Sequence, residues 1–271
     1  MQGWKKILFI PILACTFQCL LGQTIYITTG QTLYRLNLEQ CTYQFVVDME
    51  VMNVSNITFL PDGTLVGINR SGALFKIDTI SGDTFLLYKF SGQLFDALTS
   101  SSDGTIYATG RDGELWTYDV YTGNALFLGN IGFGYGGDLA FYKGELYMSS
   151  TFDDLIIRVD LNNLVNSNIV MSNAGGDGGG MYGIVTYAED CNDVRFYGIV
   201  SGNFLIYEVD LVAQTTDTVC ILDKLFSGAA TTHEFFASSP VEVIDTQIIH
   251  PGCGNSNGLI DLTVIGGTPP Y

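Results

Sequence analysis

The chain contains 271 residues and carries 28 Asp and Glu side chains against 11 Lys and Arg, a net charge of −17. This balance argues against nucleic-acid or anionic-membrane binding through a basic surface. Hydrophobic residues make up 47% of the sequence, which is enough to bury a sizeable core and argues against disorder over most of the chain.

The N-terminus has the layout of a secretory signal. Lys5 and Lys6 precede an uncharged, mostly apolar run over residues 8–21, which is short for a membrane-spanning helix. We predict cleavage near Gly22, so the mature protein would be secreted or held at the outer cell surface, without membrane insertion. An alternative is a lipoprotein signal with Cys15 as the lipidated residue.

From residue 25 to about residue 237 the sequence repeats with a period of about 40 residues. Leu65, Ile106 and Leu146 mark corresponding positions, 41 and 40 residues apart. A matching apolar segment that ends in aspartate recurs at residues 73–78, 114–119, 155–160 and 205–210. We therefore expect one repeat-built domain over residues 23–238.

Each repeat reads as four short strands. In the clearest unit the strands are predicted at residues 57–60, 64–69, 73–78 and 84–90, separated by the Asp-Gly and Ser-Gly pairs that tight turns favour. Four antiparallel strands per unit are typical of a β-propeller blade. Helical periodicity is absent, and residues 161–165 read better as a turn.

The first and last repeats are incomplete. Residues 25–49 supply three strands without a leading one, and residues 225–236 supply one or two without a complete set. Pairing the last strand with the first unit would close the ring and protect the sheet edges. The prediction is an all-β propeller of about five to six four-stranded blades, with an open hairpin array or a β-solenoid as alternatives.

Residues 59–66, FLPDGTLV, resemble the Phe-x-Pro-Asp-Gly-x-Leu-Tyr phrase of secreted propellers of the NHL and lactonase-like types. Residues 138–141 resemble the innermost strand of the same kind of unit. The resemblance concerns architecture and transfers no activity, because propellers host many unrelated functions.

Residues 253–271, CGNSNGLIDLTVIGGTPPY, resemble the opening half of the SprB-type repeat, a β-sandwich module in surface adhesins of gliding Bacteroidetes. Ile260, Leu262 and Val264 alternate as in a strand. We expect residues 239–271 to form a linker and the truncated start of such a module. The resemblance implies a fragment of a longer parent protein that continues beyond Tyr271.

After signal removal four cysteines remain, Cys41, Cys191, Cys220 and Cys253, which allow three full pairings in an oxidising compartment. Cys191 with Cys220 would close the shortest loop within the propeller. The SprB resemblance implies that the partner of Cys253 lies near the end of its module, outside this chain.

Catalytic and metal-binding signals are sparse. His233 and His250 are the only histidines, and we interpret both as surface or loop residues. Asp62, Asp103 and Asp112 adjoin glycines and are expected to form turns, as are the repeated Asp78, Asp119, Asp160 and Asp210. No catalytic, cofactor or metal-ligating residue is predicted, although surface carboxylates could bind calcium weakly.

Two glycine-rich stretches, residues 132–137 and 175–180, lead into predicted innermost strands. Loops of this kind line one face of a propeller, so Tyr135, Asp138, Asp177 and Tyr182 are candidate residues at the rim of a central pocket. The alternative is that both stretches only connect blades.

The sequence leaves two classes of function. The preferred one is a non-enzymatic binding or adhesion scaffold, associated with gliding motility, whose partner is an extracellular protein or glycan. The alternative is a lactonase-like or other metal-dependent propeller hydrolase. The C-terminal resemblance favours the scaffold.

Overall fold

A computed structural model describes residues 24–91, 94–134, 136–176, 179–188, 193–200, 202–232, 242–249 and 259–265. Over these ranges the chain is all-β apart from short 3-10 turns, one of which, Leu164–Asn166, overlaps the turn predicted at residues 161–165. The predicted signal at residues 1–22 lies outside them. None of the helical structure in these ranges is long and apolar enough to cross a bilayer.

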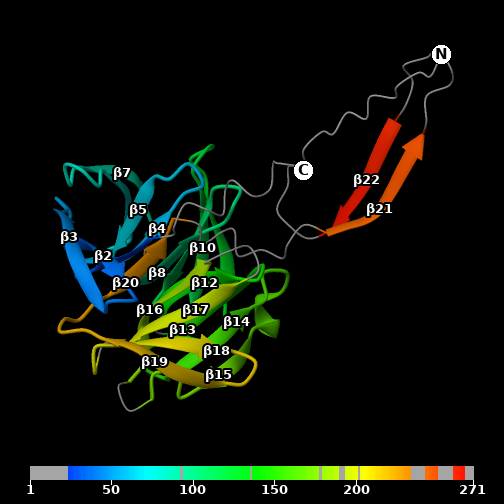
Figure 1. Ribbon diagram of the computed structural model, residues 1–271. Helices are drawn as coiled ribbons and strands as arrows, with labels where there is room; N and C mark the ends of the chain where they lie inside the picture. Colours follow the sequence, from blue (N-terminus) through cyan, green and yellow to red (C-terminus); the bar gives the residue numbers. More distant parts are fainter. Residues whose placement is uncertain are drawn as a thin grey trace, which may run out of the picture.

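Five four-stranded antiparallel sheets form the blades of a β-propeller (Figure 1). Blade 1 contains β20 (Gly228–Thr231), β1 (Ile25–Thr28), β2 (Thr32–Asn37) and β3 (Thr42–Asp48). Blade 2 contains β4 (Val54–Phe59), β5 (Leu65–Asn69), β6 (Ala73–Ile77) and β7 (Thr84–Lys89). Blade 3 contains β8 (Phe95–Ser100), β9 (Thr105–Gly110), β10 (Glu114–Asp119) and β11 (Ala125–Asn130). Blade 4 contains β12 (Gly136–Tyr142), β13 (Glu145–Ser150), β14 (Leu155–Val159) and β15 (Asn168–Ser172). Blade 5 contains β16 (Met181–Ala188), β17 (Val194–Val200), β18 (Leu205–Asp210) and β19 (Thr215–Ile221).

The predicted ring closure is confirmed, and the blade number is five. β20, from the end of the repeat region, pairs antiparallel with β1, from Ile25↔Thr231 to Thr28↔Gly228. In Figure 1 the orange β20 accordingly lies beside the blue strands of blade 1. The innermost strands β20, β4, β8, β12 and β16 contact one another in that cyclic order around a central axis.

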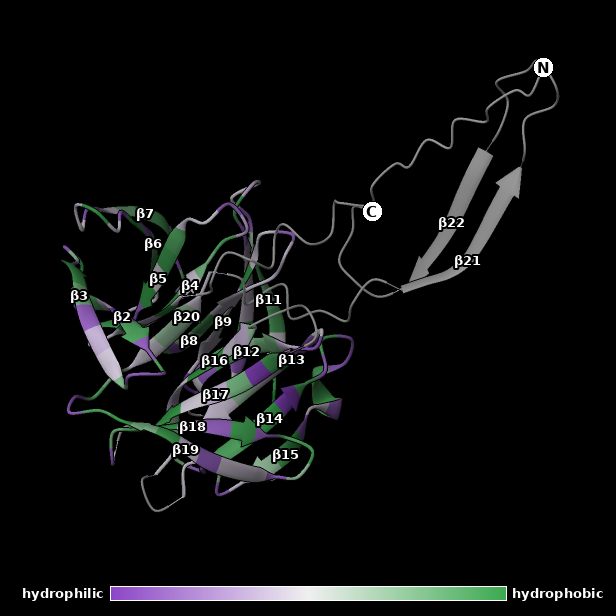
Figure 2. Ribbon diagram, viewed as in Figure 1, coloured by the Kyte–Doolittle hydropathy of each residue, from purple (hydrophilic) through white to green (hydrophobic). Residues whose placement is uncertain are grey.

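The hydrophobic core is divided among the five interfaces between neighbouring blades. Each interface holds its own cluster of buried side chains, for example Leu74, Phe90 and Phe95 between blades 2 and 3. Strands such as β13 and β18 carry both apolar and polar residues (Figure 2). β13 is buried from Leu146 to Ser150, whereas β18 buries only Ile206 and Val209. Every blade therefore depends on both of its neighbours for burial.

One predicted boundary shifts. The first strand of blade 2 begins at Val54, three residues before the predicted start at Ile57. A β-bulge separates Val54 from Asn56 in the pairing with β5, so the alternation of facing side chains is interrupted there.

The predicted turn role of the repeated aspartates is confirmed. Oδ1 of Asp78, Asp119 and Asp210 each accepts two backbone N–H bonds from the following turn, and Oδ1 of Asp160 does the same. Oδ1 of Asp62 accepts a bond from the backbone N–H of Thr64 at 2.9 Å. Such Asx turns explain why aspartate recurs at this position.

Of the pairings that the sequence left open, the structure forms Cys41–Cys220, so Cys220 does not pair with Cys191, the partner that would close the shortest loop. Cys41 lies in the turn between β2 and β3 of blade 1, and Cys220 lies in the outer strand of blade 5. Ring closure brings these segments together across 179 residues of sequence, which loop length alone could not reveal. Cys191 and Cys253 lie outside the described residues.

A further two-stranded antiparallel sheet contains β21 (Glu242–Ile249) and β22 (Leu259–Ile265). β22 confirms the strand predicted at residues 260–264.

Candidate functional site

A cavity of about 410 Å³ lies at one mouth of the central axis. Its walls come from all five blades, which is the arrangement expected of a ligand site in a propeller. The described lining residues are Thr29, Gly30, Asn53, Val54, Ser55, Arg70, Asp96, Arg111, Gly136, Gly137, Thr151, Phe152, Tyr182, Leu225 and Ser227.

Four innermost strands contribute a residue to this cavity, and each does so at a β-bulge. In β4, β8, β12 and β16 the pairing with the second strand skips one residue, which is Ser55, Asp96, Gly137 or Tyr182. All four skipped residues line the cavity. A bulge re-aims the residue that it leaves unpaired, so blades 2 to 5 each place a different residue at the cavity, and the glycine of blade 4 leaves space there.

The second group of lining residues lies in the loops between the second and third strands of the blades. Blade 1 supplies Gly30, blade 2 supplies Arg70, blade 3 supplies Arg111, and blade 4 supplies Thr151 and Phe152. Phe152 is 70% exposed, so its ring is accessible from the solvent.

The charged residues among the described lining are two arginines and one carboxylate. Nε of Arg70 lies 3.3 Å from Oδ1 of Asp96, and Nε of Arg111 lies 3.5 Å from Oδ2 of the same residue. Asp96 thus holds one arginine from its own blade and one from blade 2. The group carries one net positive charge in a chain whose net charge is −17.

Beneath the cavity, Asn56 and Asp138 meet on the axis, and both are fully buried. Nδ2 of Asn56 donates to Oδ1 of Asp138 at 2.6 Å. The backbone N–H of Leu139 donates to Oδ1 at 2.7 Å, and the backbone N–H of Ile184 donates to Oδ2 at 2.9 Å. The carboxylate therefore ties together the inner strands of blades 2, 4 and 5.

Burial raises the pKa of Asp138 well above its usual value, because desolvation penalises the charged form. The N–H bonds from Ile184, Leu139 and Asn56 act in the opposite direction and stabilise the carboxylate. Asp138 is accordingly a buried structural acid rather than a solvent-exposed one.

The four residues predicted at a pocket rim are placed differently. Tyr182 lines the cavity at the bulge of β16. Asp138 belongs to the buried contact beneath it, and it is absent from the described lining. Tyr135 and Asp177 lie outside the described residues, as do His233 and His250.

The two arginines at the cavity were not predicted from the sequence. Arg70 and Arg111 occupy equivalent positions in the segments NRSG and GRDG, which begin at residues 69 and 110. Aligning the repeats over this loop would have revealed them. In the part of the chain that the structure describes, no three His, Cys, Asp or Glu side chains group closely enough to hold a metal ion.

A second, smaller cavity of about 290 Å³ lies at the seam between blades 1 and 5. Arg35, Glu39, Tyr187 and Tyr197 are among its lining residues. We favour the axial cavity as the functional site because it is larger and because several blades direct equivalent residues into it.

Comparison with solved structures places this architecture among known proteins. The chain is a five-bladed β-propeller. It is similar to a chain in the crystal structure of a nidogen/laminin complex, with a TM-score of 0.55 and 11% identity over 79% of this chain and 99% of that one. It is also similar to an auxiliary nutrient binding protein from Bacteroides thetaiotaomicron VPI-5482, with a TM-score of 0.52 and 16% identity over 72% of this chain and 53% of that one. At these identities the likeness concerns the fold alone. No family model and no curated protein matches the sequence.

Proposed function

We propose that this propeller is a non-enzymatic binding scaffold that holds an extracellular ligand at the axial cavity. The observation that carries the proposal is the bulge shared by β4, β8, β12 and β16, which places a different residue from each of these four strands at one cavity. A repeated backbone with variable side chains at its convergence point is a means of building a specific site.

Two observations support a location outside the cytoplasm. The Cys41–Cys220 disulfide suits an oxidising compartment, and the N-terminal sequence has the layout of a secretory signal. We further propose that the propeller is displayed by a longer surface adhesin, with a possible link to gliding motility. The resemblance of residues 253–271 to an SprB-type repeat supports that extension.

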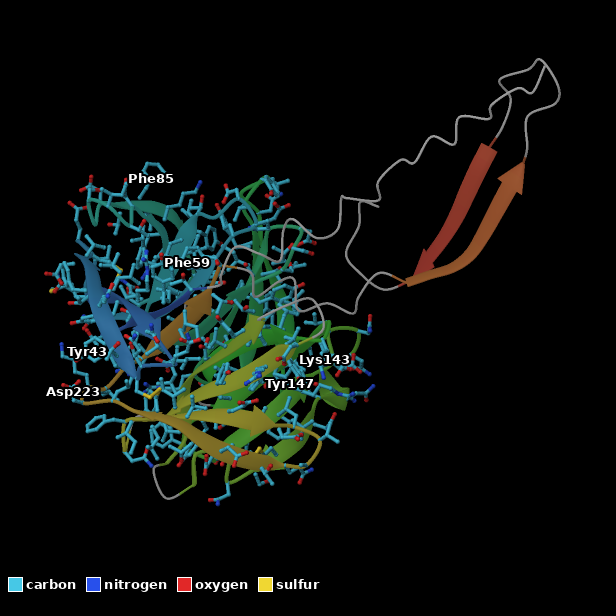
Figure 3. The ribbon with its side chains drawn as sticks, viewed as in Figure 1. Tyr43, Phe59, Phe85, Lys143, Tyr147 and Asp223 are labelled. Carbon is cyan, nitrogen blue, oxygen red and sulfur yellow. A yellow bond between two sulfur atoms is a disulfide. The ribbon has the colours of Figure 1, made fainter. Side chains whose placement is uncertain are left out.

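Exposed phenylalanines at two sites allow a controlled test of the binding site. Phe152 at the cavity is 70% exposed, and Phe85 on the outer strand β7 is 71% exposed (Figure 3 labels Phe85). The wild type, Phe152→Ala and Phe85→Ala would be screened against immobilised neutral and acidic oligosaccharides and extracellular proteins. We expect Phe152→Ala to weaken ligand binding at least about fivefold, since aromatic contacts dominate such sites. We expect Phe85→Ala to bind as the wild type does.

The same screen separates the scaffold from the hydrolase alternative. Ester and lactone substrates would be added with calcium or zinc. Metal-dependent turnover that is lost with the cavity variant would replace the scaffold proposal with a hydrolase. Binding that Phe85→Ala abolishes and Phe152→Ala leaves intact would move the site away from the axis.

A further inference from the structure

We propose that the axial cavity recognises an acidic saccharide, through a sugar carboxylate held between Arg70 and Arg111. This inference rests on the proposed function, because it assigns a ligand class to the same cavity. The juxtaposition that carries it is a pair of arginines paired with one aspartate, in a cavity whose lining also includes two aromatic residues.

The local charge at the axial cavity differs in sign from the charge of the whole chain. Acidic side chains dominate the protein, which as a whole repels anions. Within the described lining, however, two guanidinium groups face a single carboxylate. Placing a surplus arginine at the mouth of a cavity, in so acidic a chain, creates a local preference for an anionic group.

Each of the two guanidinium groups has more N–H donors than its contact with Asp96 uses. Asp96 pairs with Nε of each arginine, at 3.3 Å for Arg70 and 3.5 Å for Arg111, and each guanidinium has two further nitrogen atoms that can donate. Nε of Arg111 is buried and makes no hydrogen bond, although it lies within ion-pair distance of Asp96. A buried donor without a hydrogen bond costs stability, so its presence beside a cavity indicates a ligand role. The planar guanidinium matches a carboxylate in a bidentate geometry.

The walls of the axial cavity offer aromatic and polar side chains to a ligand. Phe152 and Tyr182 provide aromatic surface, and Asn53 provides an amide that can both donate and accept. The hydroxyls of Ser55 and Ser227 already donate to backbone carbonyls, so they can only accept from a ligand. Sugar hydroxyls also donate and accept, and the apolar face of a sugar ring packs on aromatic side chains. A volume of about 410 Å³ lies at the small end of ligand sites, which suits the end of a saccharide chain.

An acidic peptide is the competing ligand. Its backbone N–H groups would need acceptors, yet the one carboxylate in the described lining, Asp96, is already engaged by both arginines. The cavity therefore fits a carboxylate whose neighbouring groups are hydroxyls better than one whose neighbours are amides.

Matched probes test the inference. Calorimetric titration of the full chain would compare a galacturonate oligomer, its methyl ester, a neutral galactose oligomer and a glutamate peptide of equal charge. We expect the free carboxylate oligomer to bind at least about tenfold more tightly than the ester, since a charge-assisted bond contributes that much. Added salt should reduce this preference.

Arginine variants locate the contact. Arg111→Gln should lose about tenfold in affinity for the galacturonate oligomer and should bind the ester as the wild type does. Arg111→Lys should recover part of the loss, because it restores the charge without the planar fork. The control is Arg158→Gln, since Arg158 pairs with Glu145 on blade 4 at 3.2 Å.

The outcomes separate this inference from the proposed function. Equal binding of acid and ester, or tighter binding of the glutamate peptide, overturns the acidic-saccharide assignment and leaves the cavity as a binding site. Wild-type affinity in Arg111→Gln overturns it as well. If every ligand in the wider screen binds Phe152→Ala normally, the cavity itself is not the site.

Discussion

At the scale of single residues, Asp138 shows how one buried carboxylate can connect separate parts of the ring. It accepts hydrogen bonds from the side chain of Asn56 and from the backbone of Leu139 and Ile184, which belong to three different blades. Burial of all these groups means that water cannot replace a lost partner.

Replacing Asp138 with alanine should therefore destabilise the protein strongly. Removing the carboxylate leaves the buried N–H groups of Leu139 and Ile184 without this acceptor, whereas Nδ2 of Asn56 keeps its bonds to the backbone oxygens of Asp96 and Gly137. At about 1 to 3 kcal/mol for each lost partner, we expect a loss of about 2 kcal/mol or more. Urea unfolding at pH 7 measures it. Asp210→Ala is the control, because its exposed carboxylate also accepts two N–H bonds but water can replace it. Equal losses in the two variants would refute the axial role.

The pH dependence of stability should have opposite signs at Asp119 and Asp138. The hydroxyl and N–H bonds of Thr122 and the N–H bond of Tyr121 lower the pKa of Asp119, so its contribution is present above pH 3.8 and is lost as pH falls further. Burial raises the pKa of Asp138, so the folded state binds its proton more tightly than the unfolded state. Its contribution falls as pH rises above 3.8.

Asparagine variants isolate these two contributions, because neither asparagine titrates. The unfolding free energy of the wild type minus that of Asp119→Asn should decrease as pH is lowered below about 4. The corresponding difference for Asp138→Asn should increase as pH is lowered toward 4. Parallel slopes for the two pairs would show that the burial of Asp138 has been misassigned.

The roles of residues whose hydrogen-bond partners are close in the sequence could be predicted from the sequence. The turn aspartates accept bonds from residues two or three positions later, so the chain around each one contains its whole explanation. Asp138 and Asp96 have partners far away in the sequence, and only the closed ring brings those partners together.

At the scale of elements, the β-bulges of β4, β8, β12 and β16 lie at the cavity. Each bulge inserts one residue into an otherwise regular ladder of strand pairs. This insertion changes neither the amino-acid composition of the repeat nor its period of about 40 residues. Four strands were predicted for the type unit at nearly their observed positions, but the extra residue at Ser55 gave no signal in a single unit. This is why the cavity was expected only through its glycine-rich loops.

Gly137 is the bulged residue of β12, and its lack of a side chain is required. A Cβ placed there would overlap the backbone oxygen of Met181 and would crowd the side chain of Thr151. We expect Gly137→Ala to lose about 1 to 3 kcal/mol of stability, since the backbone must shift. Gly183 on β16 is the matched control, because its nearest neighbour is 3.4 Å from the added Cβ.

Chemical denaturation of the two variants gives the comparison. Gly183→Ala should stay within about 1 kcal/mol of the wild type. If Gly137→Ala is equally mild, the close approach of β12 and β16 at the cavity is wrong.

At the scale of the whole molecule, one strand pairing and one disulfide hold the ring of blades closed. The pairing of β20 with β1 joins the ends of the repeat region within blade 1. The Cys41–Cys220 disulfide joins blade 1 to the outer strand of blade 5. The strand closure followed from counting strands in the incomplete end repeats, whereas the disulfide depends on which turn meets which strand once the ring exists.

Removing the disulfide should loosen the ring without abolishing it. For a loop of 179 residues the chain-entropy relation gives about 5 kcal/mol, as an upper bound. The double variant Cys41→Ser, Cys220→Ser should therefore unfold at a clearly lower urea concentration and keep the same β-sheet signal in circular dichroism. Peptide mapping of the non-reduced wild type should recover the Cys41–Cys220 link. Recovery of Cys191 joined to Cys220 would contradict the ring geometry.

The central claim is that the axial cavity is where this propeller takes its ligand. Hydrogen–deuterium exchange of the full chain, with and without a saturating galacturonate oligomer, tests it most directly. We expect slower exchange in peptides that cover β8 and the loops at Arg70 and Arg111, with no change in the outer strands β7 and β11. Protection confined to the outer strands would contradict the account, and no protection anywhere would contradict the acidic-saccharide assignment.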